Sequence, residues 1–122
     1  MLALKILNTN LTYHLNNSDF SSVADFFTEQ AVYREGDRDA VGPERIVLLL
    51  EETLDLGVRQ IFTDPYLHIL NEGKARGCFL RVVFSRVSGN PSLGSISDVM
   101  DEYELCVDQC WRISRRAVTL VF

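Results

Sequence analysis

The segment "VMDEYELCV" contains Asp101, the acidic residue with the strongest case for a chemical role. Side chains alternate along a strand, so Asp101 shares a face with Val99, Tyr103 and Leu105. If that face is concave, Asp101 is a carboxylate in an apolar site, where burial disfavours its charged form, as in general acids and bases. If the face points outward, the same residues meet solvent or a second copy of the chain. The pattern leaves both alternatives open.

Histidine and tyrosine side chains offer further polar groups. A lone histidine on a strand, such as His68, is more typical of a half-exposed position than of a catalyst. His14 closes a predicted helix, where a cation suits the helix dipole. Tyr13 and Tyr33 can each supply a hydroxyl to a pocket or pack as ordinary core residues.

The remaining reactive side chains form no pattern in the sequence that indicates a cofactor site. An odd number of cysteines, Cys78, Cys106 and Cys110, favours free thiols in a reducing cytoplasm over a secreted disulfide framework. No histidine or third cysteine accompanies Cys106 and Cys110 in the sequence, so we expect apolar-type thiols and no metal site. Phosphate loops, dinucleotide fingerprints and nucleophile elbows are also lacking in the sequence, so we expect a cofactor-free protein.

Composition limits the classes of partner. The 122 residues are 47% hydrophobic and 24% charged, which is ordinary for one globular domain spanning residues 1–122. A formal net charge of −5 without a basic run argues against nucleic acid. The longest aliphatic run, "IVLLL", is too short to span a membrane, and the first fifteen residues do not resemble a signal peptide.

Helical periodicity dominates the first half of the chain. Leucines at helical spacing predict an amphipathic helix over residues 2–15. Ser18 is expected to cap a short second helix, and Pro43 suits the first position of a third helix that Gly57 would end. The buried faces of the second and third helices would consist of Phe20, Val23, Ala24, Phe27, Ile46, Val47, Leu50 and Leu54.

Alternation dominates the second half. Strands are predicted at residues 31–35, 58–70, 74–87, 98–107 and 111–121, and "SGNPSLGSIS" at 88–97 is predicted to be a loop. Pro65 and Gly77 are expected to mark an edge or points of curvature. Helices followed by a run of strands indicate an α+β domain, with three helices on one face of a curved, mostly antiparallel sheet.

Several charged and aromatic residues of the last strand are expected to have structural roles. The arginines at 112, 115 and 116 should alternate on an exposed strand and pair with the abundant acids. Trp111 and Ile113 are then predicted to lie in the core or in a dimer contact.

The succession of "NNSDFSSVADFFTEQAVYREGD", "GPERIVLLL", "VRQIFTD", "GKARGCFLRVVF" and "CWRISRRAV" resembles the nuclear transport factor 2-like superfamily, in its SnoaL-like polyketide-cyclase and dehydratase branch. The resemblance implies a cone-shaped α+β barrel around an apolar pocket. It also implies dimerisation through the outer sheet face.

The resemblance also implies acid and base positions in the pocket, and this chain departs from them. Asn16 stands where the family commonly has Asp, Gln30 replaces a carboxylate in "EQA", and Gln60 replaces a histidine in "VRQ". Amides form hydrogen bonds but do not titrate. Asn16 and Gln30 also fit as surface residues near helix ends.

Three functions follow as hypotheses. The first is a cytoplasmic, cofactor-free, homodimeric domain that binds a small apolar or carbonyl-bearing molecule. Its ligand pocket would contain Gln60, Gln30, Asn16, Tyr33, Tyr103 and Tyr13. The second is a cyclase, isomerase, dehydratase or epoxide hydrolase in which Asp101 transfers the proton. The third is a dimeric scaffold module without a ligand.

Overall fold

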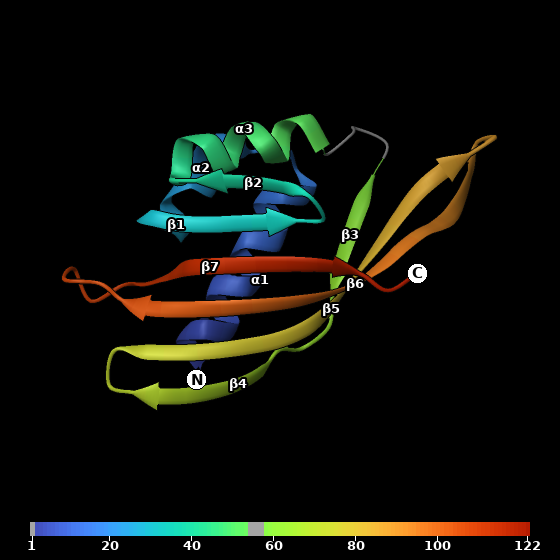
Figure 1. Cartoon of the computed structure of the whole chain (residues 1–122). Helices are drawn as coiled ribbons and strands as arrows, with labels where there is room; N and C mark the ends of the chain where they lie inside the picture. The colour runs from blue at the N-terminus through green and yellow to red at the C-terminus, as the bar shows by residue number, and fades with distance from the viewer. Residues whose placement is uncertain (1, 54–57) are drawn as a thin grey trace.

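The computed structural model describes residues 2–53 and 58–122, in which helices pack against one sheet (Figure 1). The helices are α1 (Leu2–Asn16), α2 (Phe20–Val23), the 3₁₀ helix η1 (Ala24–Phe26) and α3 (Pro43–Thr53). The strands are β1 (Phe27–Glu35), β2 (Arg38–Val41), β3 (Arg59–Phe62), β4 (Tyr66–Asn71), β5 (Lys74–Val87), β6 (Asn90–Leu105) and β7 (Trp111–Leu120).

The sheet runs in the order β2-β1-β7-β6-β5-β3, and β4 pairs with the other half of the same edge of β5. β1 and β7 are parallel and the remaining pairs are antiparallel. The sheet curves around α1 but does not close, because β2 and β3 lie at opposite ends of the strand order (Figure 1). This arrangement confirms the predicted α+β class.

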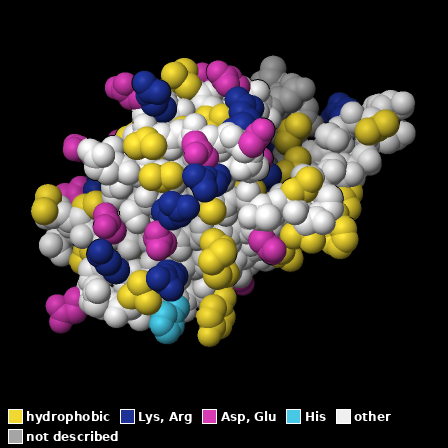
Figure 2. Space-filling view, viewed as in Figure 1, with side chains coloured by type: hydrophobic (Ala, Val, Ile, Leu, Met, Phe, Trp, Pro, Cys, Tyr) yellow, Lys and Arg dark blue, Asp and Glu magenta, His cyan; other side chains and the backbone are white. Residues whose placement is uncertain are grey.

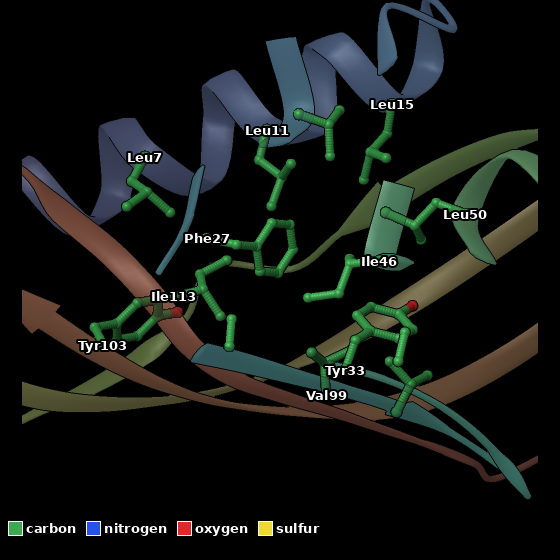
Figure 3. Packing of buried hydrophobic residues seen from close by; sticks show 14 of the residues in the cluster. Leu7, Leu11, Leu15, Phe27, Tyr33, Ile46, Leu50, Val99, Tyr103 and Ile113 are labelled. Carbon is green, nitrogen blue, oxygen red and sulfur yellow. The ribbon is translucent and has the colours of Figure 1, made fainter. Parts of the chain in front are cut away.

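The core lies between the apolar stripe of α1 and the concave face of the sheet (Figure 3). Leu7 and Leu11 point from the helix toward Ile113 and Phe27, and Leu15 points toward Leu50. Each fully buried side chain of this size contributes about 1.5–3 kcal/mol. The stripe therefore fixes α1 across the sheet, as its helical periodicity predicts.

One predicted helix start is confirmed by the structure and another is wrong. Pro43 begins α3 as predicted, whereas Leu54 and Gly57 lie outside the described residues. The prediction that Ser18 caps the second helix is wrong: Ser18 has φ 55°, and Asp19 occupies the cap position. The Asp19 carboxylate accepts hydrogen bonds from the hydroxyls of Ser21 and Ser22.

The sheet is more extensive than alternation predicts. Residues 88–97 are not a loop, because β5 and β6 continue as a paired hairpin that turns at Ser88 and Gly89. Both turn residues have positive φ, which matches the tight turns of two-residue hairpins. Another strand, β2, is not predicted by the sequence pattern, and β1 begins at Phe27 instead of residue 31.

The predicted strand over residues 58–70 is divided into β3 and β4 around Pro65, which fits an edge position because proline has no N–H to donate. Asn16, at the end of α1, holds β3 in place. Its Oδ1 accepts from the Gln60 backbone N–H at 2.8 Å, and its Nδ2 donates to the Gln60 carbonyl at 2.8 Å. This amide ties the edge strand to the helix.

We predict that Asn16→Ala destabilises the fold by about 1–3 kcal/mol, because two hydrogen bonds to a backbone unit are lost and each is worth about 0.5–1.5 kcal/mol. Urea denaturation gives the free energy of unfolding. Asn17→Ala is the matched control, since the neighbouring amide is exposed and its one hydrogen bond to the described residues goes to the Tyr13 carbonyl. Equal losses of unfolding free energy in the two variants would contradict this role of Asn16.

Candidate functional site

Asp101 and Arg116 form a buried ion pair on the concave face of the sheet. Arg116 Nε donates to Asp101 Oδ1 at 2.7 Å, and Arg116 Nη2 donates to Oδ2 at 2.7 Å. The Asp101 residue is 2% exposed and Arg116 is 4% exposed. Of the two alternatives for Asp101, the structure has the inward one. The carboxylate nevertheless lies against a guanidinium instead of in a purely apolar pocket.

Arg116 is buried because β7 carries a β-bulge. Tyr103 pairs with Ile113 and Glu102 pairs with Arg115, which leaves Ser114 as the extra residue. A bulge shifts the alternation by one position, so Arg116 points inward on the same side as Ile113. The prediction that Arg116 lies on an exposed face is therefore wrong, although Arg115 is exposed as expected.

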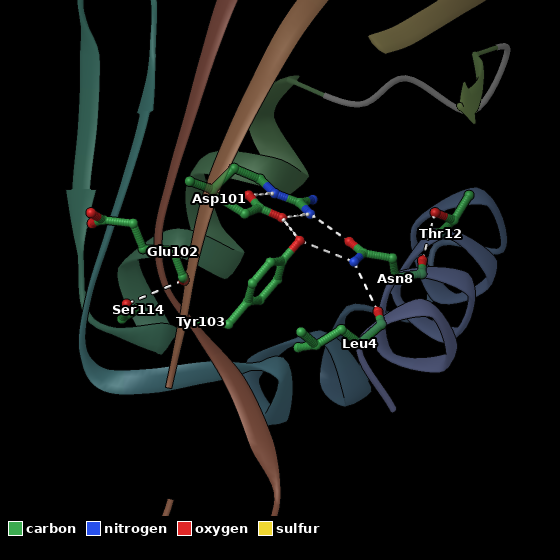
Figure 4. Close-up of polar contacts among 8 residues, drawn as sticks. Leu4, Asn8, Thr12, Asp101, Glu102, Tyr103 and Ser114 are labelled. Carbon is green, nitrogen blue, oxygen red and sulfur yellow. Dashed lines mark hydrogen bonds and ion pairs between the residues drawn. The ribbon is translucent and has the colours of Figure 1, made fainter. Parts of the chain in front are cut away.

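Tyr103 and Asn8 complete the network around the ion pair (Figure 4). The Tyr103 hydroxyl donates to Asp101 Oδ2 at 2.7 Å and accepts from Asn8 Nδ2 at 3.0 Å. Asn8 Oδ1 accepts from Arg116 Nη2 at 3.1 Å. Asn8 was not predicted from the sequence, where the available signal was a polar residue within the leucine stripe of α1.

Gly77 makes room for this network. A Cβ on Gly77 would approach the Tyr103 hydroxyl to 2.8 Å, which is closer than carbon and oxygen pack. The pairing of β5 with β6 continues unbroken through Gly77, whereas the register shifts between Val83 and Phe84 on β5. Gly77 is thus required for close packing against Tyr103.

Arg116 and Tyr103, the two groups that bond Asp101, each keep one protonation state near neutral pH. Burial alone would lower the pKa of Arg116, but the negative charge and hydrogen bonds of Asp101 raise it above its ordinary value. Burial, followed by the charge of Asp101, raises the pKa of Tyr103. A charged guanidinium and a neutral phenol therefore surround Asp101, whose oxygens accept three hydrogen bonds.

A second ion pair lies on the same concave face. Arg81 donates from Nη1 and Nη2 to the two Glu35 oxygens, both at 3.0 Å, and the Tyr33 hydroxyl donates to Glu35 Oε1 at 2.8 Å. Although burial opposes it, the Arg81 hydrogen bonds and charge lower the pKa of Glu35. Arg81 Nε is buried and has no hydrogen-bond partner among the described residues.

The interior hollow that the resemblance implies is small. It has a volume of about 10 Å³, close to the minimum for a single water molecule. Its polar wall consists of Tyr33, Gln60, Arg81 and Arg116. The apolar wall residues are Leu11, Leu15, Phe27, Leu50, Phe62 and Val118. Side chains therefore fill most of the space inside the curved sheet.

Gln60 and Tyr33 are the predicted pocket residues that reach this cavity. Gln60 is 5% exposed. Within the described part of the chain, the backbone N–H and carbonyl of Gln60 make hydrogen bonds to the Asn16 side chain. Its side-chain amide makes none there. Arg81 Nε is the only fully buried polar side-chain atom without a partner in the described ranges, so the unpartnered Gln60 amide keeps some contact with solvent at the surface groove that it lines and is free to bond a ligand.

Other predicted site residues lie elsewhere. Gln30 is exposed on β1, and Tyr13 is 64% exposed on α1, so neither side chain is buried in the interior. Asn16 uses its amide on the β3 backbone. His14 Nδ1 lies 3.0 Å from the Asp19 carboxylate near the end of α1, and His68 is exposed on β4.

The chain belongs to the SnoaL-like domain family, whose model matches residues 1–117. This family binds small molecules and includes cyclases and dehydratases. A search of curated protein sequences gave no significant match.

Solved structures share the fold. A protein with a cystatin-like fold from Novosphingobium aromaticivorans, described as NTF2-like, has a TM-score of 0.87 at 18% identity over 98% of this chain and 80% of its own. A protein from the same organism, proposed to be a scytalone dehydratase, has a TM-score of 0.85 at 19% identity, covering 100% of this chain and 84% of its own.

A third structure, from Catenulispora acidiphila, was solved in complex with S-DNPA. It has a TM-score of 0.83 at 22% identity, covering 98% of this chain and 91% of its own. At these identities the similarity establishes the fold. Separately, none of the helices in the described ranges is long and apolar enough to cross a membrane.

We predict that Asp101→Leu destabilises the protein by about 3–5 kcal/mol, because the Arg116 charge is left buried without its partner. Adding Arg116→Met should recover much of this loss, since the charge itself is removed. Chemical denaturation of both single variants and the double variant gives the coupling energy, which is about 0.5–3 kcal/mol for contacting residues. Additive effects would show that the two residues do not act as a pair.

Proposed function

We propose that this domain binds a small, mainly apolar molecule through a hydrogen bond to the Gln60 amide, without a cofactor. The observation that carries the proposal is the buried Gln60 side chain, which has no hydrogen-bond partner in the described ranges. The unpartnered Nε of Arg81 contributes a second donor on the wall of the same cavity. A ligand with a carbonyl oxygen matches donors surrounded by apolar side chains.

Neutral ligands fit this site better than anions. The guanidinium groups of Arg116 and Arg81 are already paired with Asp101 and Glu35. Because each positive charge has a carboxylate within hydrogen-bond distance, little attraction remains for a second anion. A ketone or a similar neutral acceptor is therefore the proposed functional group.

Proton transfer by Asp101 has weaker support. Its carboxylate is occupied by Arg116 and Tyr103, and it lines neither the interior cavity nor the groove between α1 and β3. A general base must reach the proton that it abstracts. The family includes dehydratases, but the role that this geometry favours for Asp101 is to hold the interior together.

We predict that Gln60→Leu weakens binding of the fluorescent ketone 6-acetyl-2-dimethylaminonaphthalene by about 2- to 10-fold, the equivalent of one hydrogen bond. The same substitution should not destabilise the free protein, because the Gln60 amide makes no hydrogen bond to the described residues that leucine would lose. A titration of the emission shift and urea denaturation measure the two effects. Gln30→Leu, at an exposed position, should leave the affinity unchanged.

Two outcomes of these measurements would contradict the proposal. Absence of saturable binding by the unsubstituted protein, to this ketone and to a panel of apolar carbonyl compounds, would refute the proposed function. Equal affinities of the Gln60→Leu and Gln30→Leu variants would remove Gln60 from the binding site.

We further propose that the domain is a cytoplasmic homodimer that associates through the outer sheet face. On neighbouring strands, Tyr66 pairs with Cys78 and Cys78 pairs with Met100. Tyr66 is 76% exposed and Met100 is 60% exposed, with Leu80 nearby on β5. Figure 2 shows hydrophobic side chains gathered on this face among charged ones. Contiguous apolar surface of this kind is typical of interfaces, and free thiols suit a reducing compartment.

We predict that Met100→Glu converts the dimer to a monomer, because it places charges at the centre of an apolar contact. Sedimentation velocity measures the mass of each variant. Leu48→Glu provides the control on α3, where Leu48 is 57% exposed on the helical side of the molecule. A monomeric unsubstituted protein, or a Met100→Glu variant that remains dimeric, contradicts this interface.

A further inference from the structure

A surface groove lies next to the interior cavity. It runs between α1 and the segment from β3 to Pro65, and it has a volume of about 300 Å³. Gln60 and Phe62 line both the groove and the cavity, so these two side chains form the partition between them. Asn8 reaches the same groove from the helix while bonding Tyr103 and Arg116 in the interior.

The volumes of the cavity and of the groove determine which of the two can hold a ligand. The interior cavity of about 10 Å³ has room for about one water molecule. The groove reaches the lower end of the range of roughly 300–1,000 Å³ that is typical of small-molecule sites. Most of any ligand that bonds to Gln60 must therefore lie on the groove side of the partition.

The partition stands on a short edge strand, which Asn16 ties to α1. β3 has four residues and, in the described ranges, pairs only with β5. Phe62 is half-buried, with its ring 5.5 Å from that of Phe79 and 5.6 Å from the Arg116 guanidinium carbon. By contrast, Phe27, which separates the cavity from a second groove near β1, is 3% exposed.

We propose that the α1–β3 groove is the entrance to the interior and holds most of the ligand, whose acceptor end reaches Gln60 beside Phe62. This inference rests on the proposed function, because it locates the ligand that Gln60 binds. The partition residues then act in selection: Gln60 recognises the acceptor oxygen, and Phe62 contacts the apolar body of the ligand.

The groove wall indicates the class of molecule. Phe62 and Pro65 provide apolar surface, whereas Thr9 and Thr12 line the helix side; the Thr12 hydroxyl donates to the Asn8 carbonyl at 2.8 Å and can only accept from a ligand. Lys5 and Asp64 carry opposite charges, so the groove has no net charge from these residues. A neutral amphipathic molecule, with an apolar body and hydrogen-bonding substituents at its outer end, fits this wall.

The experiment uses a substitution that fills the groove with a large side chain and leaves the cavity unchanged. Thr9 is exposed on α1 and lines the groove, so Thr9→Trp should occupy the proposed ligand volume. We expect at least about a tenfold loss of affinity for 6-acetyl-2-dimethylaminonaphthalene, equivalent to about 1.4 kcal/mol. Asn10→Trp is the matched control, because it adds the same ring at the next, exposed position of the helix. Circular dichroism and urea denaturation verify that both variants are folded.

A third variant tests whether a ligand enters through the groove near β1 instead. Glu29 is exposed and lines the groove near β1, so Glu29→Trp obstructs access past Phe27. Loss of affinity in Thr9→Trp alone supports the α1–β3 entrance. Loss in Glu29→Trp alone, or binding by Thr9→Trp equal to that of Asn10→Trp while Gln60→Leu is weakened, overturns the entrance and leaves the proposed function intact. No binding by the unsubstituted protein overturns both.

Discussion

The buried Arg116–Asp101 pair constrains the rest of the interior. A guanidinium and a carboxylate taken out of water each lose several kcal/mol of hydration, which only close, fully bonded partners can offset. Asp101 therefore requires both Arg116 donors and the Tyr103 hydroxyl, and Arg116 requires Asn8 as well. These contacts join α1, β6 and β7, and Tyr103 fits only because Gly77 on β5 has no side chain.

The same constraint separates structural polar groups from those available to a ligand. Asp101 has the burial expected of a general acid or base, but its hydrogen-bonding capacity is used within the fold. Gln60 is almost equally buried, yet its side-chain amide lacks a partner within the described ranges. Burial alone therefore does not identify a functional residue. The decisive property is burial together with unused hydrogen-bonding capacity.

Periodicity predicted the elements whose side chains repeat regularly and missed those that depend on a local irregularity. The leucines of α1 and the alternation in β5 are regular, and both elements form as expected. One extra residue, Ser114, reverses the alternation in β7 and brings Arg116 inside. Ser88 supports a hairpin turn only by adopting positive φ, which its residue type does not indicate. The partners of Asp101 and Asn16 depend on tertiary contacts and could not be predicted.

The charge balance of the interior explains why an amide suits position 60. Both buried arginines are committed to Asp101 and Glu35, so the cavity wall has no spare cation for another carboxylate. An ionised side chain beside Phe62 would be desolvated without a counter-charge, at a cost that favours its neutral form. A carboxamide is neutral at every pH at which the protein folds, and it both donates and accepts hydrogen bonds. With a carboxamide at position 60 the cavity wall keeps a neutral polar group that cannot transfer a proton, which makes recognition the chemistry that residue 60 can provide.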